Sequence, residues 1–316
     1  MSTSNQSNSS NRKSYKIATI PGDGIGPDVI SAGIKTLEST YYKNHGKYLP
    51  DDALEIVREF EAVFFGSAGS YISLGFETSS LPTIETICKC HAYEDFEREN
   101  SEGEYAGHGG SSHKGEKWAV ATETSIFTRV RVDRIMRFAF ETARGRKRKH
   151  LTVVTKSNAQ RNEMVFWDEV AEEVEETMNT KMVLQPRSID TIVATNLHAD
   201  ILSDLAAALA GSIGIAPTSN LDPTRNNPSM FEPIHGSAFD LVGKGVANPV
   251  GTLWSAAEML RWLGEGYAAD LLMDSVENVL ESGVKTLDLG GQAKTHEVVD
   301  AVFAETEVVV RKTKGS

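Results

Sequence analysis

The sequence predicts an α/β fold in which helices cover a mostly parallel sheet, and three observations lead to this class. The chain has 316 residues, of which 40% are hydrophobic and 24% charged, so it is globular and long enough to bury a sizeable core. Short apolar segments alternate with amphipathic ones, as strands alternate with helices in covered parallel sheets. The first apolar segment also runs through a glycine-rich turn into a helix, which is a common α/β opening.

The first elements follow from the order of these segments. Residues 15–20 (YKIATI) form a short apolar strand, and residues 21–27 (PGDGIGP) form the turn before a helix that runs to residue 37. A helix near residues 52–60 precedes the second strand, at residues 62–66 (AVFFG). The turn could hold a phosphate on the helix N-terminus, but its spacing is not GxGxxG, so a structural turn is favoured.

The rest of the chain repeats the alternation. Strands are predicted at residues 150–155 (HLTVVT) and 191–194 (TIVA), because both segments are short and apolar. A loop or hairpin tip is predicted at residues 107–115 (GHGGSSHKG), which are rich in glycine. Helices are predicted at residues 162–176, 199–210, 254–263 and 268–282.

Charge and cysteine content exclude several classes of protein. Asp and Glu (44) outnumber Lys and Arg (32), and a net charge of −12 argues against a nucleic-acid coat or an anionic-membrane binder. No apolar run approaches the roughly 20 residues of a membrane span. Residues 1–14, rich in Ser and Asn, are predicted to be a disordered tail without a secretory signal. Two close cysteines, Cys88 and Cys90, suggest no disulfide framework and predict a reducing compartment, the cytoplasm.

Two aspartates are candidate metal ligands. Asp200 and Asp204 stand four residues apart in NLHADILSD, so both carboxylates share one face of a helix. Carboxylate oxygens at that spacing suit Mg²⁺ or Mn²⁺. On spacing alone, a helix N-cap and a solvated acid explain the pair as well.

Two further residues are candidates for proton transfer. Lys156 (VTKSN) follows a buried strand, and reactive groups gather at the carboxyl ends of strands in such sheets. Tyr105 lies among charged residues, where a phenol could act as a general acid. The alternatives are a surface lysine and ordinary hairpin packing. The loop at residues 232–240 (EPIHGSAFD), followed by Asn248, could hold ribose and adenine, although by composition alone it is a polar loop.

Five motifs in a fixed order carry a family resemblance. IPGDGIGP, RENSEGEYAG, VTKSNA, NLHADILSDL and EPIHGSAFDLVGKGVANP resemble the β-decarboxylating dehydrogenases, which act on isocitrate, isopropylmalate, tartrate or D-malate. The resemblance covers residues 15–37, 50–69, 97–176 and 181–316. It is closest to the tartrate/D-malate branch, because the other two branches usually carry a glycine where Ala199 stands.

The resemblance implies a two-domain fold of the isopropylmalate/isocitrate dehydrogenase type, with a cleft between the domains. The large, dinucleotide-binding domain would comprise residues 15–96 and 211–316, and the small domain, which binds metal and dimerises, residues 97–210. The family acts as a homodimer because each cleft borrows residues from the partner. The implied reaction is NAD-dependent, divalent-metal-dependent oxidation of a small 2-hydroxy diacid, with or without β-decarboxylation.

The resemblance also implies residue roles. Asp200 and Asp204 would bind Mg²⁺ or Mn²⁺, and Arg98 would bind the substrate carboxylate. Lys156, supplied to the partner's cleft, would take the hydroxyl proton, and Tyr105 would protonate the enol carbon. Asp240 would favour NAD, because a carboxylate repels a 2′-phosphate. The implied cofactor-binding residues are Asn158, His235, Gly236, Ser237, Asp240 and Asn248.

The chain departs from the family pattern at three places. An extra strand is missing after residue 37, and between residues 177 and 182 the family's metal aspartate, which is lent to the partner, is absent. Between residues 69 and 98 an unrelated string replaces the helix that carries the substrate arginines. Codons can be chosen for residues 75–96 so that the next reading frame gives a family-like peptide: LPTIETICKC becomes CQPLKQYANV. We hypothesise a frame-shifted reading, which transcript sequencing tests.

These departures leave rival functions open. Loss of a strand, of one metal carboxylate and of the arginines predicts a protein of low stability with weak metal and substrate binding. The alternatives to a tartrate/D-malate type of enzyme are an isopropylmalate-like dehydrogenase and a non-catalytic remnant that keeps the dinucleotide loop.

Overall fold

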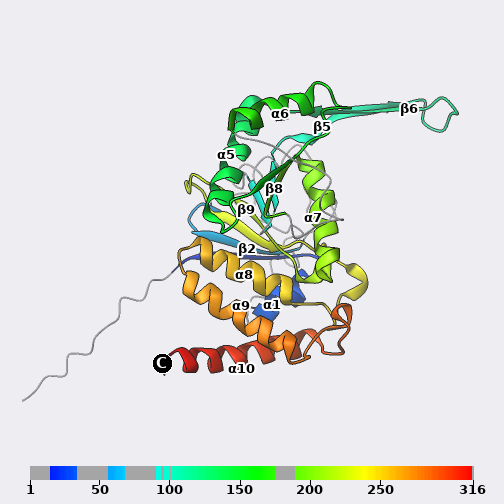
Figure 1. Cartoon of the computed structure of the whole chain (residues 1–316). Helices are drawn as coiled ribbons and strands as arrows, with labels where there is room; N and C mark the ends of the chain where they lie inside the picture. The colour runs from blue at the N-terminus through cyan, green and yellow to red at the C-terminus, as the bar shows by residue number, and fades with distance from the viewer. Residues whose placement is uncertain are drawn as a thin grey trace, which may run out of the picture.

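The computed structural model describes residues 15–33, 56–67, 90–93, 96–99, 101–174 and 189–314. In this part of the chain the main sheet has eight strands, in the order β1-β2-β10-β9-β3-β4-β8-β7 (Figure 1). The strands are β1 (Ile17–Gly22), β2 (Ala62–Ser67), β3 (Cys90–Tyr93), β4 (Phe96–Glu99), β7 (Leu151–Val154), β8 (Thr191–Ala194), β9 (Pro217–Leu221) and β10 (Ser229–Pro233). The helices are α1 (Gly26–Gly33), α5 (Arg129–Gly145), α6 (Glu163–Val174), α7 (Asn196–Ala210), α8 (Val250–Trp262), α9 (Gly266–Glu281) and α10 (Thr295–Lys314).

The α/β class is confirmed, but the sheet is mixed rather than mostly parallel. β1, β2 and β10 are parallel to one another, and so are β4, β8 and β7. Between these groups, β9 and β3 run antiparallel to their neighbours. The connection from β9 to β10 explains part of this, because a short turn can join only antiparallel strands. The carboxylate of Asp222 fixes that turn by accepting hydrogen bonds from the backbone N–H groups of Thr224 (3.0 Å) and Asn227 (3.1 Å).

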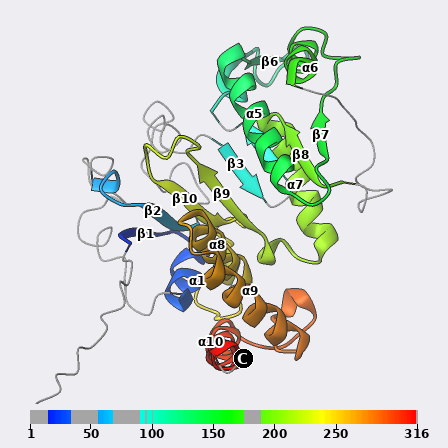
Figure 2. The same ribbon diagram turned by 60° about the vertical axis from the view of Figure 1, so that its left-hand side comes forward.

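Two of the hydrophobic clusters lie under different helices. One packs α5 and α6 against β7 and β8 around the buried side chains of Ile135, Met136 and Trp167. The other packs α8 on β2 and β10 through Phe64, Phe231 and Met259. α8, α9 and α10 pack in succession on that side (Figure 2). In the described ranges, no helix combines the length and apolar character that crossing a bilayer requires.

Several element boundaries differ from the predicted ones for local reasons. The strand at Thr191–Ala194 is confirmed, but α7 begins at Asn196, because Thr195 caps it and accepts a hydrogen bond from the His198 N–H. α8 begins four residues before its predicted start. The predicted helix near residues 52–60 and the predicted helix ends at 37 and 176 fall wholly or partly outside the described residues.

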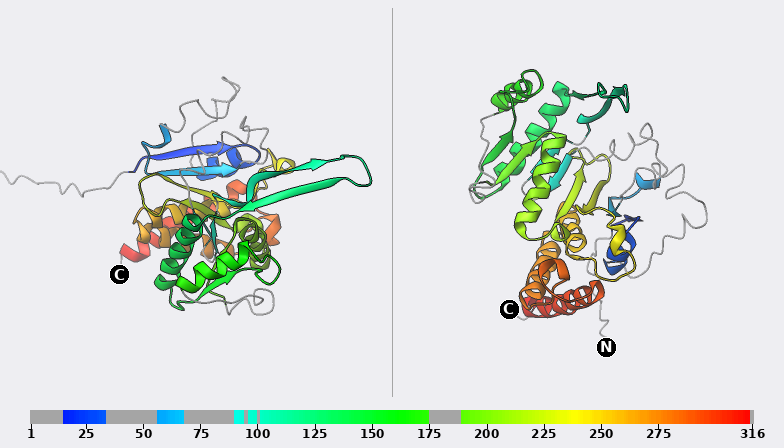
Figure 3. Two further views of the ribbon diagram at one scale, coloured as in Figure 1. Left: turned by 90° about the horizontal axis from the view of Figure 1, so that it is seen from above. Right: turned by 90° about the vertical axis from the view of Figure 1, so that its right-hand side faces the viewer.

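The predicted loop or tip at residues 107–115 is mostly strand. β5 (Gly103–Ser112) and β6 (Val120–Ile126) form an antiparallel arm that projects from the molecule (Figure 3). The turn therefore starts only after Ser112. The two gaps after residues 37 and 177, and most of the string at residues 75–96, lie outside the described ranges.

Candidate functional site

Three predicted site segments meet at one edge of the sheet. Arg98 lies in β4, Asn196 follows β8, and Lys156 follows β7. These strands are parallel, with Arg98 and Val154 both in register with Ala194, so their carboxyl ends lie at the same edge. Ligands bind in α/β sheets at such an edge. The sheet thus places these groups on a common side although they are far apart in sequence.

Arg98, Tyr105 and Asp200 form a contacting cluster at this edge. The Arg98 guanidinium forms an ion pair with Asp200, and its Nε donates to Asn196 Oδ1 at 2.9 Å. The Tyr105 hydroxyl donates to the other oxygen of Asp200 at 3.2 Å, and Arg98 lies 5.6 Å from the centre of the tyrosine ring. Arg98 is largely buried, whereas Tyr105 is 52% exposed. The guanidinium, the phenol and the carboxylate therefore lie together at a solvent-accessible part of this edge.

The acidic residues of RENSEGEY hold this cluster in place, and the sequence reasoning gave them no role. Buried Glu99 accepts from Arg134 Nη2 at 2.8 Å on both oxygens. Glu102 accepts from the N–H (2.7 Å) and hydroxyl (2.8 Å) of Thr128, which precedes α5. Glu104 accepts from the Thr195 hydroxyl at 2.6 Å and the Leu197 N–H at 3.1 Å. Carboxylates at helix N-termini are stabilising. The acidic residue at every second or third position was the sequence signal that could have pointed to these contacts.

Gly103 lies between Glu102 and Glu104 and allows the backbone to pass close to its neighbours. Its φ is +98°, and a Cβ there would lie 3.2 Å from the Phe127 ring and 3.4 Å from Asn196 Cβ. A side chain would be both strained and crowded at this position. The glycine in the motif is therefore explained by the close approach of β5 to α7.

The two candidate metal ligands lie on α7, as the spacing predicts. Both are accessible to solvent, and Asp200 is 44% exposed. Burial and the charge of Asp200 raise the pKa of Asp204, against the lowering effect of Arg98. In the described ranges, no group of three or more His, Cys, Asp or Glu side chains is arranged to hold a metal. The two carboxylates fit a hard divalent cation by chemistry, but they would form only part of its coordination shell.

Lys156 and Asn158 are not brought into contact with this cluster. Both are exposed in the loop after β7. The loop is held by the Lys156 carbonyl, which accepts from the N–H groups of Ala159 and Gln160 at 2.9 Å. Beside it lies an open cavity of about 700 Å³, lined by Ser125, Phe127, Ala159, Gln160, Arg161, Asn162, Glu163 and Phe166.

The glycine-rich turn packs against the HGS loop, which supports its structural interpretation. The Ile25 N–H donates to the Ser237 carbonyl at 2.8 Å, and the Ser237 hydroxyl donates to the Asp23 carboxylate. Gly24 has a φ of +57°, and a Cβ there would lie 1.9 Å from the Ser237 carbonyl oxygen. The first turn of the sequence and the candidate nucleotide loop thus form one unit.

The candidate nucleotide-binding residues differ in their exposure to solvent. His235 is buried, and among the described residues its Nε2 has no hydrogen-bond partner. Burial lowers the pKa of His235, so the imidazole is neutral at neutral pH. Gly236 and Asp240 are exposed, Asp240 within the short 3₁₀ helix Phe239–Leu241. A neutral buried imidazole with an unpaired nitrogen, in the same loop as an exposed carboxylate, suits a nucleoside with ribose hydroxyls.

The side chain of Asn248 is already committed to the protein. Its Oδ1 accepts from the Val250 N–H at 3.0 Å, and its Nδ2 donates to Asp288 at 2.8 Å. Any contact of Asn248 with a base therefore falls to its main chain.

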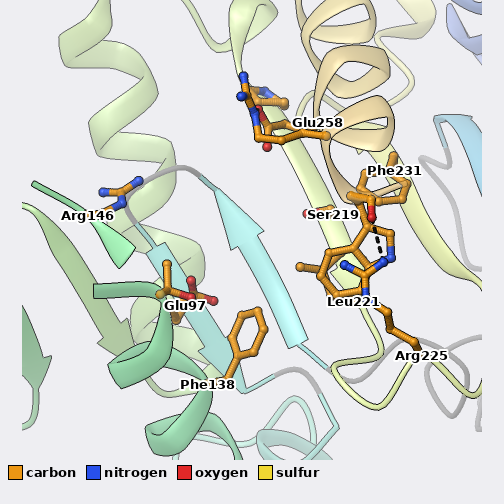
Figure 4. Close-up of a pocket in the computed structure, with 12 residues that line it drawn as sticks. Glu97, Phe138, Arg146, Ser219, Leu221, Arg225, Phe231 and Glu258 are labelled. Atoms are coloured by element: carbon orange, nitrogen blue, oxygen red, sulfur yellow. Dashed lines mark hydrogen bonds and ion pairs between the residues drawn. The ribbon is translucent and has the colours of Figure 1, made fainter. Parts of the chain in front are cut away.

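A separate cavity of about 310 Å³ contains no predicted site residue. Figure 4 shows Glu97 facing it from β4, Phe138 and Arg146 from α5 and the residue after it, and Glu258 from α8. Burial raises the pKa of Glu97 to about 8, although Thr142 and Arg146 oppose the change. The sequence reasoning gave this buried acid no role.

Comparison with known proteins gives a single family. The family model "Isocitrate/isopropylmalate dehydrogenase" matches residues 96–302. The chain is 51% identical to a probable tartrate dehydrogenase/decarboxylase of Agrobacterium vitis, over 92% of the chain and 97% of that protein. It is 38% identical to the decarboxylating D-malate dehydrogenase of Escherichia coli (strain K12), over 92% of the chain and 98% of that protein.

Solved structures agree with this result. The isocitrate dehydrogenase of Methylococcus capsulatus has a TM-score of 0.81 and 29% identity, covering 93% of this chain and 99% of its own. A β-decarboxylating dehydrogenase of Thermococcus kodakarensis has a TM-score of 0.76 and 32% identity, covering 94% and 98%. The predicted fold type, family and enzyme class are confirmed: the chain belongs to the isocitrate/isopropylmalate dehydrogenase family of enzymes.

Proposed function

We propose that the protein catalyses NAD-dependent, divalent-metal-dependent oxidation of a small 2-hydroxy diacid such as tartrate or D-malate, with loss of a β-carboxylate where the product permits it. The observation that carries the proposal is the cluster of Arg98, Tyr105 and Asp200 at the carboxyl edge of the parallel strands. The names of the relatives, tartrate dehydrogenase/decarboxylase and D-malate dehydrogenase, support the substrate class.

The residues of the cluster have complementary roles in this proposal. Arg98 binds a substrate carboxylate, because a guanidinium offers planar paired donors. Tyr105 carries an exposed hydroxyl within reach of the substrate and delivers a proton to carbon after decarboxylation. Asp200 and Asp204 hold Mg²⁺ or Mn²⁺. When bound, the metal and NAD supply a Lewis acid and a hydride acceptor.

The adenosine half of NAD binds at the HGS loop in this proposal. His235, Gly236, Ser237 and Asn248 surround it, and Asp240 accepts the ribose hydroxyls and repels a 2′-phosphate. Asn158 lies near the nicotinamide. The orphaned Nε2 of buried His235 supports a polar ligand at this place.

A homodimer completes the site. Ile201, Leu205 and Leu209 stand four residues apart on α7, and each is at least 37% exposed, so they form an apolar stripe beside Asp200 and Asp204. Pairing α7 with a second copy would cover the stripe and bring the exposed Lys156 of that copy to the acids, where it takes the hydroxyl proton. The cytoplasm is the compartment that the cysteine usage predicts.

One observation favours the rival reading of a non-catalytic remnant. The alignment with the Agrobacterium vitis relatives runs over 347 positions, more than the 316 residues of the chain. The relatives therefore carry residues that the chain lacks. A remnant would keep the HGS loop and bind NAD without turnover.

An activity assay separates the enzyme from the non-catalytic remnant. It uses purified protein with Mn²⁺, NAD and a panel of tartrates, D-malate and isopropylmalate. We expect NADH formation with tartrate or D-malate, abolished by Lys156→Ala and retained in the control Lys147→Ala. Turnover that survives Lys156→Ala would remove Lys156 as the base. NAD binding without turnover on any diacid would establish the remnant.

A further inference from the structure

The structure assigns a positioning role to Asp288: its carboxylate fixes the side chain of Asn248, and so the loop that holds the adenosine half of the dinucleotide. Asp288 lies outside the five motifs that carry the family resemblance. It lies in the short 3₁₀ helix Leu287–Leu289, forty residues beyond Asn248 in the sequence. The inference rests on the proposed function, because it concerns the proposed NAD site.

Three side chains donate to the Asp288 carboxylate. Asn248 Nδ2 and the Ser212 hydroxyl donate to one oxygen, at 2.8 and 2.5 Å, and the Thr286 hydroxyl donates to the other at 2.5 Å. Burial of the carboxyl group opposes its ionisation, but these hydrogen bonds prevail and lower the pKa of Asp288. The group is therefore ionised at neutral pH, and each bond to it is charge-assisted.

The carboxylate ties together segments that are distant in the chain. Ser212 begins the 3₁₀ helix Ile213–Ile215 and also accepts from the Gly214 N–H at 2.9 Å. A Cβ on Gly214 would lie 3.0 Å from both Asn248 Cβ and the Asp288 carboxylate, so a larger residue would force these neighbours to shift. The charge of Asp288 also reaches His235, whose pKa it raises against the dominant effect of burial. The network thus borders both ends of the candidate adenosine loop.

Asp288 leaves the main chain of Asn248 available. The bond from Nδ2 to Asp288 and the bond from the Val250 N–H to Oδ1 hold the side chain in one rotamer. Among the described residues, the N–H and C=O of Asn248 make no hydrogen bond to the protein. These two groups form a donor–acceptor pair of the kind that an adenine edge requires. Without Asp288, Asn248 Nδ2 would lose its partner and the loop would lose its fixed geometry.

The test measures binding of NAD, ADP-ribose and nicotinamide mononucleotide by calorimetry, without turnover. We expect Asp288→Asn to weaken the binding of NAD and of ADP-ribose by about tenfold, which is the effect of one lost hydrogen bond to a charged group. The affinity for nicotinamide mononucleotide should not change. Asp300→Asn, an exposed acid on α10, is the matched control and should bind as the unaltered protein does.

A double-mutant cycle separates positioning from general loosening of the fold. If Asp288 acts through Asn248, the double variant Asp288→Asn/Asn248→Ala binds ADP-ribose no more weakly than Asn248→Ala alone. In turnover assays KM for NAD rises while KM for the diacid stays constant. Fully additive losses, or an equal loss for nicotinamide mononucleotide, would overturn the assignment while leaving the proposed function intact. Absence of NAD binding in the unaltered protein would overturn both.

Discussion

The proposed metal edge, around Asp200 and Asp204, and the proposed nucleotide loop, around His235 and Asn248, are organised in opposite ways. At the metal edge, Asp200 and Asp204 are accessible, a third ligand is absent from the described residues, and Lys156 points to solvent. At the nucleotide loop, Asn248 and His235 are buried, and Asp288 joins three segments of the same chain. Under the proposed function, a single chain would therefore bind the nucleotide, whereas the chemical step would require a second copy.

The largest effect should come from a proposed metal ligand. Asp200→Asn removes a negative charge that would bind the proposed cation and that pairs with Arg98, and we expect kcat/KM to fall by on the order of 10³-fold. NAD affinity, which belongs to the other region, should stay within a factor of two or so. Steady-state kinetics and calorimetry measure both. A loss of NAD affinity as large as the loss of activity would break the comparison between the two regions.

The apolar stripe on α7 should have the next largest effect. Leu205→Asp/Leu209→Asp places two charges in the proposed interface, and we expect a monomer with at least about 100-fold lower activity and unchanged NAD binding. Sedimentation measures the oligomeric state. Val308→Asp is the control, because Val308 is exposed to a similar degree on α10. An active monomer would show that one chain contains the whole site.

The buried Glu97 should make stability depend on pH in a defined direction. Its pKa is raised by burial to about 8, so the folded state keeps a proton that the unfolded chain releases above 4.5. The contribution of Glu97 to the free energy of unfolding is therefore fully present below pH 4.5. This contribution, on the order of a few kcal/mol, is lost as the pH rises to about 8. Glu232, with a pKa raised to about 7, acts in the same direction over a narrower range.

Glu97→Gln isolates the contribution of Glu97. The amide cannot ionise, so we expect the variant to be more stable than the unaltered protein above pH 8 and to lose less stability across pH 5–8 in thermal unfolding. The exposed Glu281→Gln should leave the profile unchanged. Parallel profiles for Glu97→Gln and the unaltered protein would show that Glu97 is ionised in the fold.

The smallest effect should come from Gly214. Gly214→Ala places a methyl group 3.0 Å from Asn248 Cβ and from the Asp288 carboxylate, so the neighbours must shift by a few tenths of an ångström. We expect NAD to bind about threefold more weakly, with Mn²⁺ affinity unchanged. Gly266→Ala, which has open space around it, is the control. Weaker Mn²⁺ binding in Gly214→Ala would show that the two regions are coupled.

Short-range signals in the sequence account for much of the fold and less of the site. The strand at residues 191–194 and the alternation of strands and helices were predictable from local apolar runs. The antiparallel centre of the sheet was not, because it depends on the turn at Asp222 and on the pairing of β3, whose residues looked unrelated to the fold. Asp200 and Asp204 could be found from helix spacing alone. The pairing of Asp288 with Asn248 could not, since nothing local connects positions forty residues apart.

The most direct test of the account is complementation between two inactive variants. Asp200→Asn and Lys156→Ala chains are unfolded, mixed in equal amounts and refolded together. If each site combines Asp200 of one chain with Lys156 of the other, half of the dimers are mixed and each has one intact site, so activity returns to about a quarter of the unaltered level. Activity no higher than that of either variant alone would contradict a site shared between two copies.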